Sequence, residues 1–389
     1  MDRETKVGVV GAGTMGAGIA QVAATGGHET LVYDSDTAAC DRAAEGLAKI
    51  FDRLVHKGRL AADEAAAILK RIVFVEHLPR LSDCGIVVEA VVENLDVKRE
   101  LFSKLEGVCA PDAVLATNTS SLSVASISAA CNNPERLLGV HFFNPAPLMP
   151  LVEIVPAVRT DADVVDATRA LIDAWGKTTV VAKDTPGFIV NRVARPFYGE
   201  ALRVLEEGIA DVATIDWAMK ELGGFRMGPF QLMDFIGNDV NFTVTETVFH
   251  AFYGDPRYRP SFTQQRMVEA GLLGRKSGRG FYDYGDGARA PEPDRDEAHG
   301  RVILMRILCM LINEAADALF WGVATRDDVD LAMTRGVNYP KGLLAWADEL
   351  GPQRVLEEIE VLQSAYGEDR YRPSPLLRRM AAAGEHFLG

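Results

Sequence analysis

The chain has 389 residues, 48% hydrophobic and 25% charged, a balance typical of a globular protein with two or three domains. Its formal net charge of −14 argues against a nucleic-acid partner, which would need a basic face, and no apolar run is long enough to cross a membrane. The five cysteines are dispersed without paired spacing, as expected for reduced thiols in a cytoplasmic protein without a zinc motif.

Strands and helices alternate through the first half of the chain. This alternation predicts a mostly parallel, doubly wound sheet of the Rossmann type over residues 1–184. The predicted strands are 6–10, 30–34, 72–74, 86–90, 114–117, 138–140, 152–155 and 178–181.

The loop after the first strand carries a dinucleotide fingerprint, Gly11-x-Gly13-x-x-Gly16. In this fingerprint the first glycine permits a tight turn, the second lets the backbone approach a pyrophosphate, and the third lets helix pack on strand. Asp34 ends the next strand, where an acid accepts hydrogen bonds from the adenosine ribose and repels a 2′-phosphate. The pattern therefore favours NAD over NADP, and FAD remains the main rival.

Polar residues gather where later strands end. Glu93 and Lys98 follow strand 86–90 at the predicted carboxyl edge of the sheet, where such folds bind ligands, whereas Glu89 is interpreted as a strand-end cap. The run 117–121 (Thr-Asn-Thr-Ser-Ser), taken alone, favours a helix N-cap cluster.

His141 lies between aromatic residues and prolines, and Glu153 follows after a Pro-rich return. A lone histidine is usually structural. A carboxylate that meets an imidazole, however, fixes its tautomer and raises its basicity, which makes a general base. Together with the nucleotide fingerprint, this pair indicates proton removal coupled to hydride transfer.

Helical periodicity replaces strand signals after residues 184–187, where we place a domain boundary. Residues 286–299 have the composition of a linker. We therefore predict an all-α C-terminal region made of two copies of one helical module, 185–285 and 300–389. The repeat has an offset of 114 residues: Glu200, Gly208, Asp216 and Met219 recur as Glu314, Gly322, Asp330 and Met333, and Gly228-Pro229 has a looser counterpart in 340–342.

Five stretches of the chain, taken together and in this order, match one known family: 10–21, 118–122, 141–145, 186–192 and 275–284. Over essentially its whole length the chain resembles the L-3-hydroxyacyl-CoA dehydrogenase family. The resemblance implies NAD-dependent, reversible oxidation of a (3S)-3-hydroxyacyl-CoA to the 3-ketoacyl-CoA. Residues 224–237 and 239–242 are most similar to bacterial members acting on 3-hydroxybutyryl-CoA or 3-hydroxyadipyl-CoA, and the duplicated module resembles the fused arrangement in multifunctional β-oxidation proteins.

The same resemblance implies roles for individual residues. His141 matches the catalytic base and Glu153 the carboxylate that orients it, while Ser120 and Asn191 match groups that hold the 3-oxygen and thioester region of the substrate. Lys57 matches a coenzyme A contact. The positions matching NAD contacts are Asp34, Glu93, Lys98, Asn144 and Lys276.

Three questions stay open at this point. A dehydrogenase of a free β-hydroxy acid or sugar acid would need a basic pocket, with Arg192 and Arg226 as candidates, and Arg226 could instead read the distal carboxylate of an adipyl chain. A protein that binds NAD without catalysis is a further alternative. The assembly is expected to be a homodimer, or a monomer in which the second module stands in for a partner. No metal constellation stands out.

Overall fold

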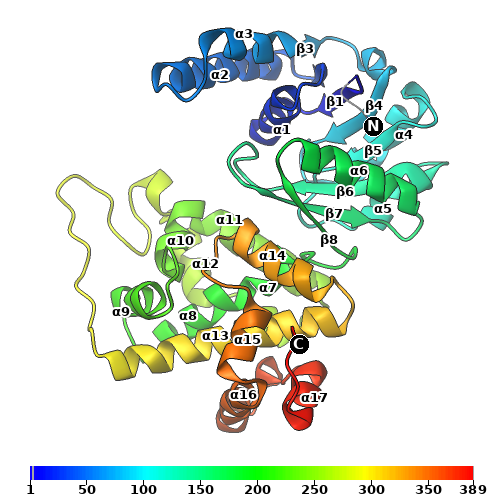
Figure 1. The fold of residues 1–389 in the computed structure, drawn as a ribbon. Helices are drawn as coiled ribbons and strands as arrows, with labels where there is room; N and C mark the ends of the chain where they lie inside the picture. Colours follow the sequence, from blue (N-terminus) through cyan, green and yellow to red (C-terminus); the bar gives the residue numbers. More distant parts are fainter. Residues whose placement is uncertain (2–3, 389) are drawn as a thin grey trace. The chain divides into compact units, whose positions relative to one another are not determined.

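The computed structural model describes residue 1 and residues 4–388, which form two compact units, Met1–Thr185 and Pro186–Gly389 (Figure 1). The first unit contains the sheet and the second is helical. Residues 2 and 3 of the predicted nucleotide domain, and residue 389 at the end of the predicted second module, lie outside the described residues.

The first unit is built on one eight-stranded sheet with the order β3-β2-β1-β4-β5-β6-β7-β8. All neighbours are parallel except β6 and β7, which confirms the predicted Rossmann-type architecture. The order reverses between β1 and β4, and folds of this kind bind ligands outside the carboxyl ends of the strands at such a point. The strands are β1 (Lys6–Val10), β2 (Thr30–Tyr33), β3 (Ile72–Val75), β4 (Cys84–Glu89), β5 (Val114–Thr117), β6 (Leu137–Phe142), β7 (Leu151–Pro156) and β8 (Thr178–Val181).

Helices cover both faces of this sheet. The helices α1 (Thr14–Thr25), α2 (Thr37–His56), α3 (Ala62–Arg71) and α6 (Ala162–Ala174) share one apolar core with strand residues such as Ile86 and Val88. Val87 and Leu115 alternate to the other face and are equally buried, on the side of α4 (Leu95–Val108) and α5 (Val124–Ser128). The described part of this unit also contains the short 3₁₀ turns η1 (Leu78–Leu81) and η2 (Pro134–Arg136).

The helices of the second unit repeat with the offset seen in the sequence. α10 and α15 begin 114 residues apart, and so do α11 and α16. The first series is α7 (Val190–Val193), α8 (Arg195–Glu206), α9 (Val212–Trp217), η3 (Ala218–Leu222), α10 (Pro229–Ile236), α11 (Asn238–Ala251), η4 (Pro256–Tyr258), α12 (Phe262–Glu269) and η5 (Arg275–Ser277). The second is α13 (Glu297–Phe320), α14 (Arg326–Gly336), α15 (Leu343–Leu350), α16 (Pro352–Tyr366), η6 (Asp369–Tyr371) and α17 (Pro375–Ala383).

An aspartate accepts the same pair of backbone hydrogen bonds in each series. Asp216 accepts hydrogen bonds of 2.9 Å from two backbone N–H groups in the first turn of α10. Asp330 accepts bonds of 2.8 and 2.9 Å from the equivalent groups of α15. Gly228 and Gly342 each lie so close to their aspartate that a Cβ would come within 2.3 Å of it. Gly342, 114 residues after Gly228, is therefore its structural counterpart.

The long helix α13, yellow in Figure 1, begins inside the predicted linker. It starts at Glu297 because Asp296 caps it, accepting hydrogen bonds from the backbone N–H groups of Ala298 (2.8 Å) and His299 (3.2 Å). The last three residues of the predicted linker 286–299 are therefore helical.

The two helical series exchange buried ion pairs. Arg192 of α7 donates to Glu314 of α13 (Nε–Oε1 2.7 Å), and Arg306 of α13 donates to Glu200 of α8 (Nε–Oε2 3.1 Å). Arg192 and Arg306 are 114 residues apart, as are the two glutamates. The contact between the two helical series is thus reciprocal.

Candidate active site

The glycine-rich turn after β1 has the geometry that a dinucleotide requires. Gly11 has φ +104°, and a Cβ there would meet the carbonyl oxygen of Ala90 at 2.5 Å; a Cβ on Gly16 would lie 1.8 Å from the carbonyl oxygen of Gly11. At Gly13 no heavy atom lies within 4 Å of a Cβ position, so the protein itself leaves this space open. α1 begins directly afterwards with no acid in its first turn, which favours an anionic group.

Asp34 links this turn to the end of β2 by hydrogen bonds. Its Oδ2 accepts a hydrogen bond from the backbone N–H of Ala12 (2.7 Å), and its Oδ1 accepts one from that of Asp36 (2.9 Å). A carboxylate has about four acceptor positions, so these bonds leave capacity for ribose hydroxyls. The turn and this acid therefore fit the adenosine half of NAD.

The carboxylate of Glu93 holds the loop that carries Ser120 in place by hydrogen bonds. Its Oε1 accepts hydrogen bonds from the Thr119 hydroxyl (2.6 Å), the Ser120 N–H (3.1 Å), and the N–H (3.2 Å) and hydroxyl (3.0 Å) of Ser121. Burial opposes ionisation of Glu93, but the Lys98 ammonium and these donors outweigh it and hold its pKa below the ordinary value. Glu93 is therefore an anion that joins the loop after β4 to the loop after β5.

Lys98 lies beneath this loop, only 1% exposed, and bridges two carboxylates. Its Nζ lies 2.5 Å from Glu89 Oε1 and 3.3 Å from Glu93 Oε2. Glu89, fully buried, also accepts bonds from the Val91 N–H and the Thr117 hydroxyl, both 2.7 Å. The interpretation of Glu89 as a strand-end cap holds, but its ion pair with Lys98 has no signal in the local sequence.

The prediction of a helix N-cap within residues 117–121 is wrong. α5 begins at Val124, and Ser123 caps it by accepting a hydrogen bond from the Ser126 N–H at 3.1 Å. Thr119, Ser120 and Ser121 turn instead toward Glu93. All five residues of this run have short polar side chains that can cap a helix. Which of them do so depends on the carboxylate of Glu93, which is distant in the sequence and bonds three of them.

His141 and Glu153 face each other across the only antiparallel pair of the described sheet, β6 and β7. Nδ1 of His141 lies 2.7 Å from Oε2 of Glu153, and the two residues are 5% and 0% exposed. Asn118 Oδ1 accepts a hydrogen bond from the Phe142 N–H (2.8 Å), and the Phe143 ring lies 4.4 Å from the imidazole. Because a carboxylate only accepts, Nδ1 carries the proton in this bond, and Nε2 holds the basic lone pair.

The remaining predicted residues lie elsewhere. Asn144 is exposed just beyond β6, and Lys57 is exposed after α2. Asn191 and Lys276 belong to the second unit, in α7 and η5, and the Lys276 ammonium pairs with Asp239 at 2.6 Å.

The two arginines proposed for a free carboxylate differ in exposure. Arg192 is 2% exposed and is bound to Glu314 and to Asp317 (3.1 Å), so it is not available to a substrate. Arg226 is exposed. Among the described residues no group of His, Cys, Asp and Glu side chains could hold a metal ion, and no helix of this part is long and apolar enough to cross a membrane.

A dinucleotide turn and a buried histidine–carboxylate pair at the carboxyl edge of one sheet define a nucleotide-dependent oxidoreductase. The family model for the 3-hydroxyacyl-CoA dehydrogenase NAD-binding domain matches residues 6–185, and the model for the C-terminal domain of the same enzymes matches 187–284 and 303–387. The chain belongs to the 3-hydroxyacyl-CoA dehydrogenase family, and its cofactor is NAD.

Similar proteins agree with this membership. A 3-hydroxyadipyl-CoA dehydrogenase of Escherichia coli is 41% identical, over 96% of this chain and 97% of its own. A 3-hydroxybutyryl-CoA dehydrogenase of Bradyrhizobium diazoefficiens is 43% identical, over 75% of this chain and 98% of its own. The crystal structure of a 3-hydroxybutyryl-CoA dehydrogenase from E. coli K12 superposes with a TM-score of 0.93 at 39% identity, covering 98% of this chain and 99% of that one.

Proposed function

We propose that the protein reversibly oxidises a (3S)-3-hydroxyacyl-CoA to the 3-ketoacyl-CoA, with His141 as general base. NAD, when bound, accepts the hydride that leaves C3. Nε2 of His141 takes the proton of the 3-hydroxyl group, and the Glu153 carboxylate at Nδ1 stabilises the imidazolium that results. The observation that carries this proposal is the buried 2.7 Å contact between these two side chains.

The other roles follow from the resemblance. Ser120, on the loop braced by Glu93, and Asn191 would hold the 3-oxygen and the thioester region of the substrate. Lys57 would contact coenzyme A. Around NAD, the adenosine half would be held by Gly11, Gly13, Gly16 and Asp34, and further contacts would come from Glu93, Lys98, Asn144 and Lys276. Because Lys98 is buried between two glutamates, we propose that it acts mainly through Glu93.

The proposed substrate is a short-chain or adipyl thioester. The relatives named above are described as acting on 3-hydroxybutyryl-CoA or 3-hydroxyadipyl-CoA. The exposed Arg226 is the candidate for reading a distal carboxylate. Comparison of C4 and adipyl thioesters in the wild type and in Arg226→Ala tests this role; a selective loss with the adipyl thioester is expected, and an equal effect on both would contradict it.

NADH oxidation by the purified protein tests the reaction class. We expect turnover with acetoacetyl-CoA and NADH, and little with free acetoacetate or with NADPH. Turnover of the free acid would favour a hydroxy-acid dehydrogenase, the alternative that loses support because Arg192 is committed to Glu314 and Asp317. NADH binding without turnover of any acyl-CoA would favour a protein that has lost catalysis.

We further propose that residues 185–285 and 300–389 are two copies of one module, and that the second occupies the surface on which the first would otherwise bind a partner. The reciprocal pairs Arg192–Glu314 and Arg306–Glu200 support this assignment. A monomer in light scattering is the expected result, and a concentration-independent dimer would contradict it. The five free thiols are consistent with the cytoplasm, which we propose as its location and which cell fractionation can test.

A further inference from the structure

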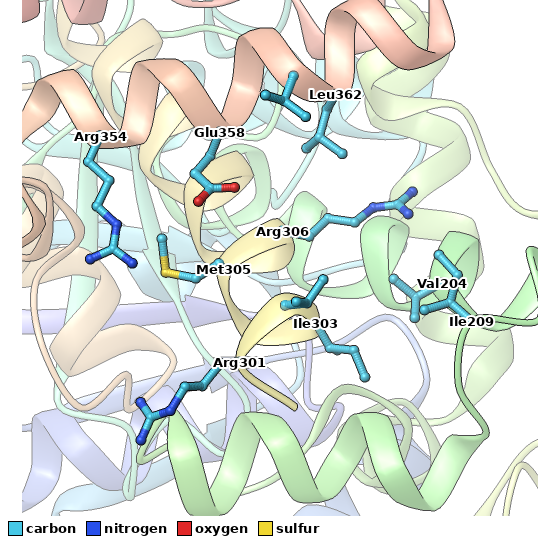
Figure 2. A pocket seen from close by; sticks show the side chains of 11 residues that line it. Val204, Ile209, Arg301, Ile303, Met305, Arg306, Arg354, Glu358 and Leu362 are labelled. Carbon is cyan, nitrogen blue, oxygen red and sulfur yellow. The ribbon is translucent and has the colours of Figure 1, made fainter. Parts of the chain in front are cut away.

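A groove of about 360 Å³ runs between α13 and α16 and ends at α8 (Figure 2). Its walls are mostly apolar and partly open to solvent: Val302 and Val361 are each 65% exposed, Ile209 is 38% exposed, and Met305 also belongs to the lining. This volume lies at the lower end of the range of small-molecule sites, which are concave and mostly apolar.

The 114-residue repeat relates this groove to the proposed active site. Val302 and Met305 of α13 occupy the repeat positions of Phe188 and Asn191, and α16 repeats α11. Asn191 is the residue of the second unit proposed to hold the substrate thioester. The groove therefore includes the repeat position of a proposed substrate contact, where a thioether replaces the amide.

One end of the groove is cationic. The guanidinium groups of Arg301 and Arg354 lie on the same side as Met305, away from Val204 and Ile209 (Figure 2). Arg354 has no ion-pair partner in the described part of the chain, and the partner of Arg301 is a largely exposed glutamate at 3.5 Å. Glu358 is the one acid in the lining. An apolar trough with arginines at one end is complementary to an apolar chain that carries an anionic head.

Arg306 does not belong to this cationic end. Its guanidinium is committed to Glu200 at 3.1 Å and to Glu207 at 2.7 Å. The cations that a ligand can reach are therefore those of Arg301 and Arg354, and substitution of Arg354 leaves the buried ion pairs between the modules intact.

We propose that this groove is a second acyl-CoA site, which binds the thioester without transforming it. The proposal rests on the proposed function, because the ligand class comes from the role proposed for Asn191, whose repeat position, Met305, lies in the groove. The acyl chain would lie between α13 and α16, and the phosphates of coenzyme A would meet Arg301 and Arg354.

Binding stoichiometry tests the proposal. Hexanoyl-CoA has no oxygen on C3 and cannot react, so calorimetric titration counts its sites directly. We expect two sites per wild-type chain. Val361→Asp and Arg354→Glu should abolish the second site or weaken it at least about 10-fold, while the rate with acetoacetyl-CoA stays within about two-fold. Val158→Asp and Arg326→Glu make the same changes at exposed positions outside the groove and should keep both sites.

The outcomes separate this inference from the proposed function. One site that is unchanged in the groove variants would overturn the second site and leave the active site in place. No binding at all, together with no turnover of acyl-CoA, would overturn both. If the groove variants change the mass measured by light scattering and not the number of bound ligands, the groove is an interface between copies of the chain, and the proposal is wrong.

Discussion

Glu200 and Glu314 lie 114 residues apart in the two helical series of the second unit, and each is bound by an arginine of the other series. Both glutamates are almost fully buried, so either charge would be costly without its partner. For Glu314 the partners are Arg192, Arg257 and the hydroxyl of Tyr258. Burial opposes its ionisation, but the two arginines and the tyrosine together hold its pKa below the usual value.

This contact predicts that Glu314→Gln destabilises the second unit. The substitution leaves two buried guanidinium groups with fewer anions, a loss that typically costs about 3–5 kcal/mol. The free energy of unfolding, measured with a denaturant, should show this loss. Glu297→Gln, on the same helix but 70% exposed, is the matched control and should change little. Equal stabilities of the two variants would show that the exchanged pairs do not hold the modules together.

His141→Gln and Glu153→Gln should both lose most of the turnover. The first removes the base and the second leaves a neutral amide beside the imidazolium, and a positioned base contributes typically about 10²–10⁴-fold. NADH binding, followed by fluorescence titration, should be retained because the glycine-rich turn is untouched. His77→Gln changes an exposed histidine and serves as the control. A near-normal rate in His141→Gln would remove the assignment of the base.

Alanine substitution should affect folding at one glycine of the turn and NADH binding at another. At Gly16 the new Cβ would lie 1.8 Å from a backbone oxygen, so Gly16→Ala should lower the melting temperature markedly. At Gly13 the space is open, so Gly13→Ala should fold normally and bind NADH more weakly, because the methyl group would occupy the place of the pyrophosphate. Thermal unfolding and NADH titration of both variants decide the matter. Unchanged NADH affinity in Gly13→Ala would argue against a pyrophosphate bound next to Gly13.

Asp216 should make stability depend on pH. Burial raises its pKa from 3.8 to about 7, despite hydrogen bonds from Tyr282 and from the first turn of α10. Between these values the folded protein binds a proton that the unfolded chain has lost, so this contribution to stability falls as pH rises from about 4 to 7.

Asp216→Asn cannot ionise and removes this dependence. The variant loses one acceptor at the start of α10, so it should be less stable than the wild type at pH 5. The difference in melting temperature between the two proteins should shrink toward pH 8. A difference that stays constant over this range would contradict the assignment.

Much of the first unit could be predicted from local sequence. The strands, the glycine-rich turn and the acid after β2 have short-range patterns, because burial and backbone conformation are decided within a few residues there. The antiparallel direction of β7 and the N-cap Ser123 were not predicted, since both depend on contacts made after the sheet assembles.

The buried ion pairs were the hardest features to predict from the sequence. Glu89 and Lys98 are nine residues apart, but their role becomes clear only when Thr117 and Glu93 close around them. Arg192 and Glu314 are separated by 122 residues, and no local period connects them. The repeat offset was the one available signal, because it places both arginines and both glutamates at matching positions.

The pairing of β6 with β7 also limits how the proposed catalytic pair can vary in sequence. His141 and Glu153 are directly opposed in register, so the backbone ladder itself brings them to one face of the sheet. The loop of residues 143–150 could gain or lose length without separating them. A single insertion inside either strand, in contrast, would turn one of the two side chains to the opposite face and leave the imidazole without its carboxylate.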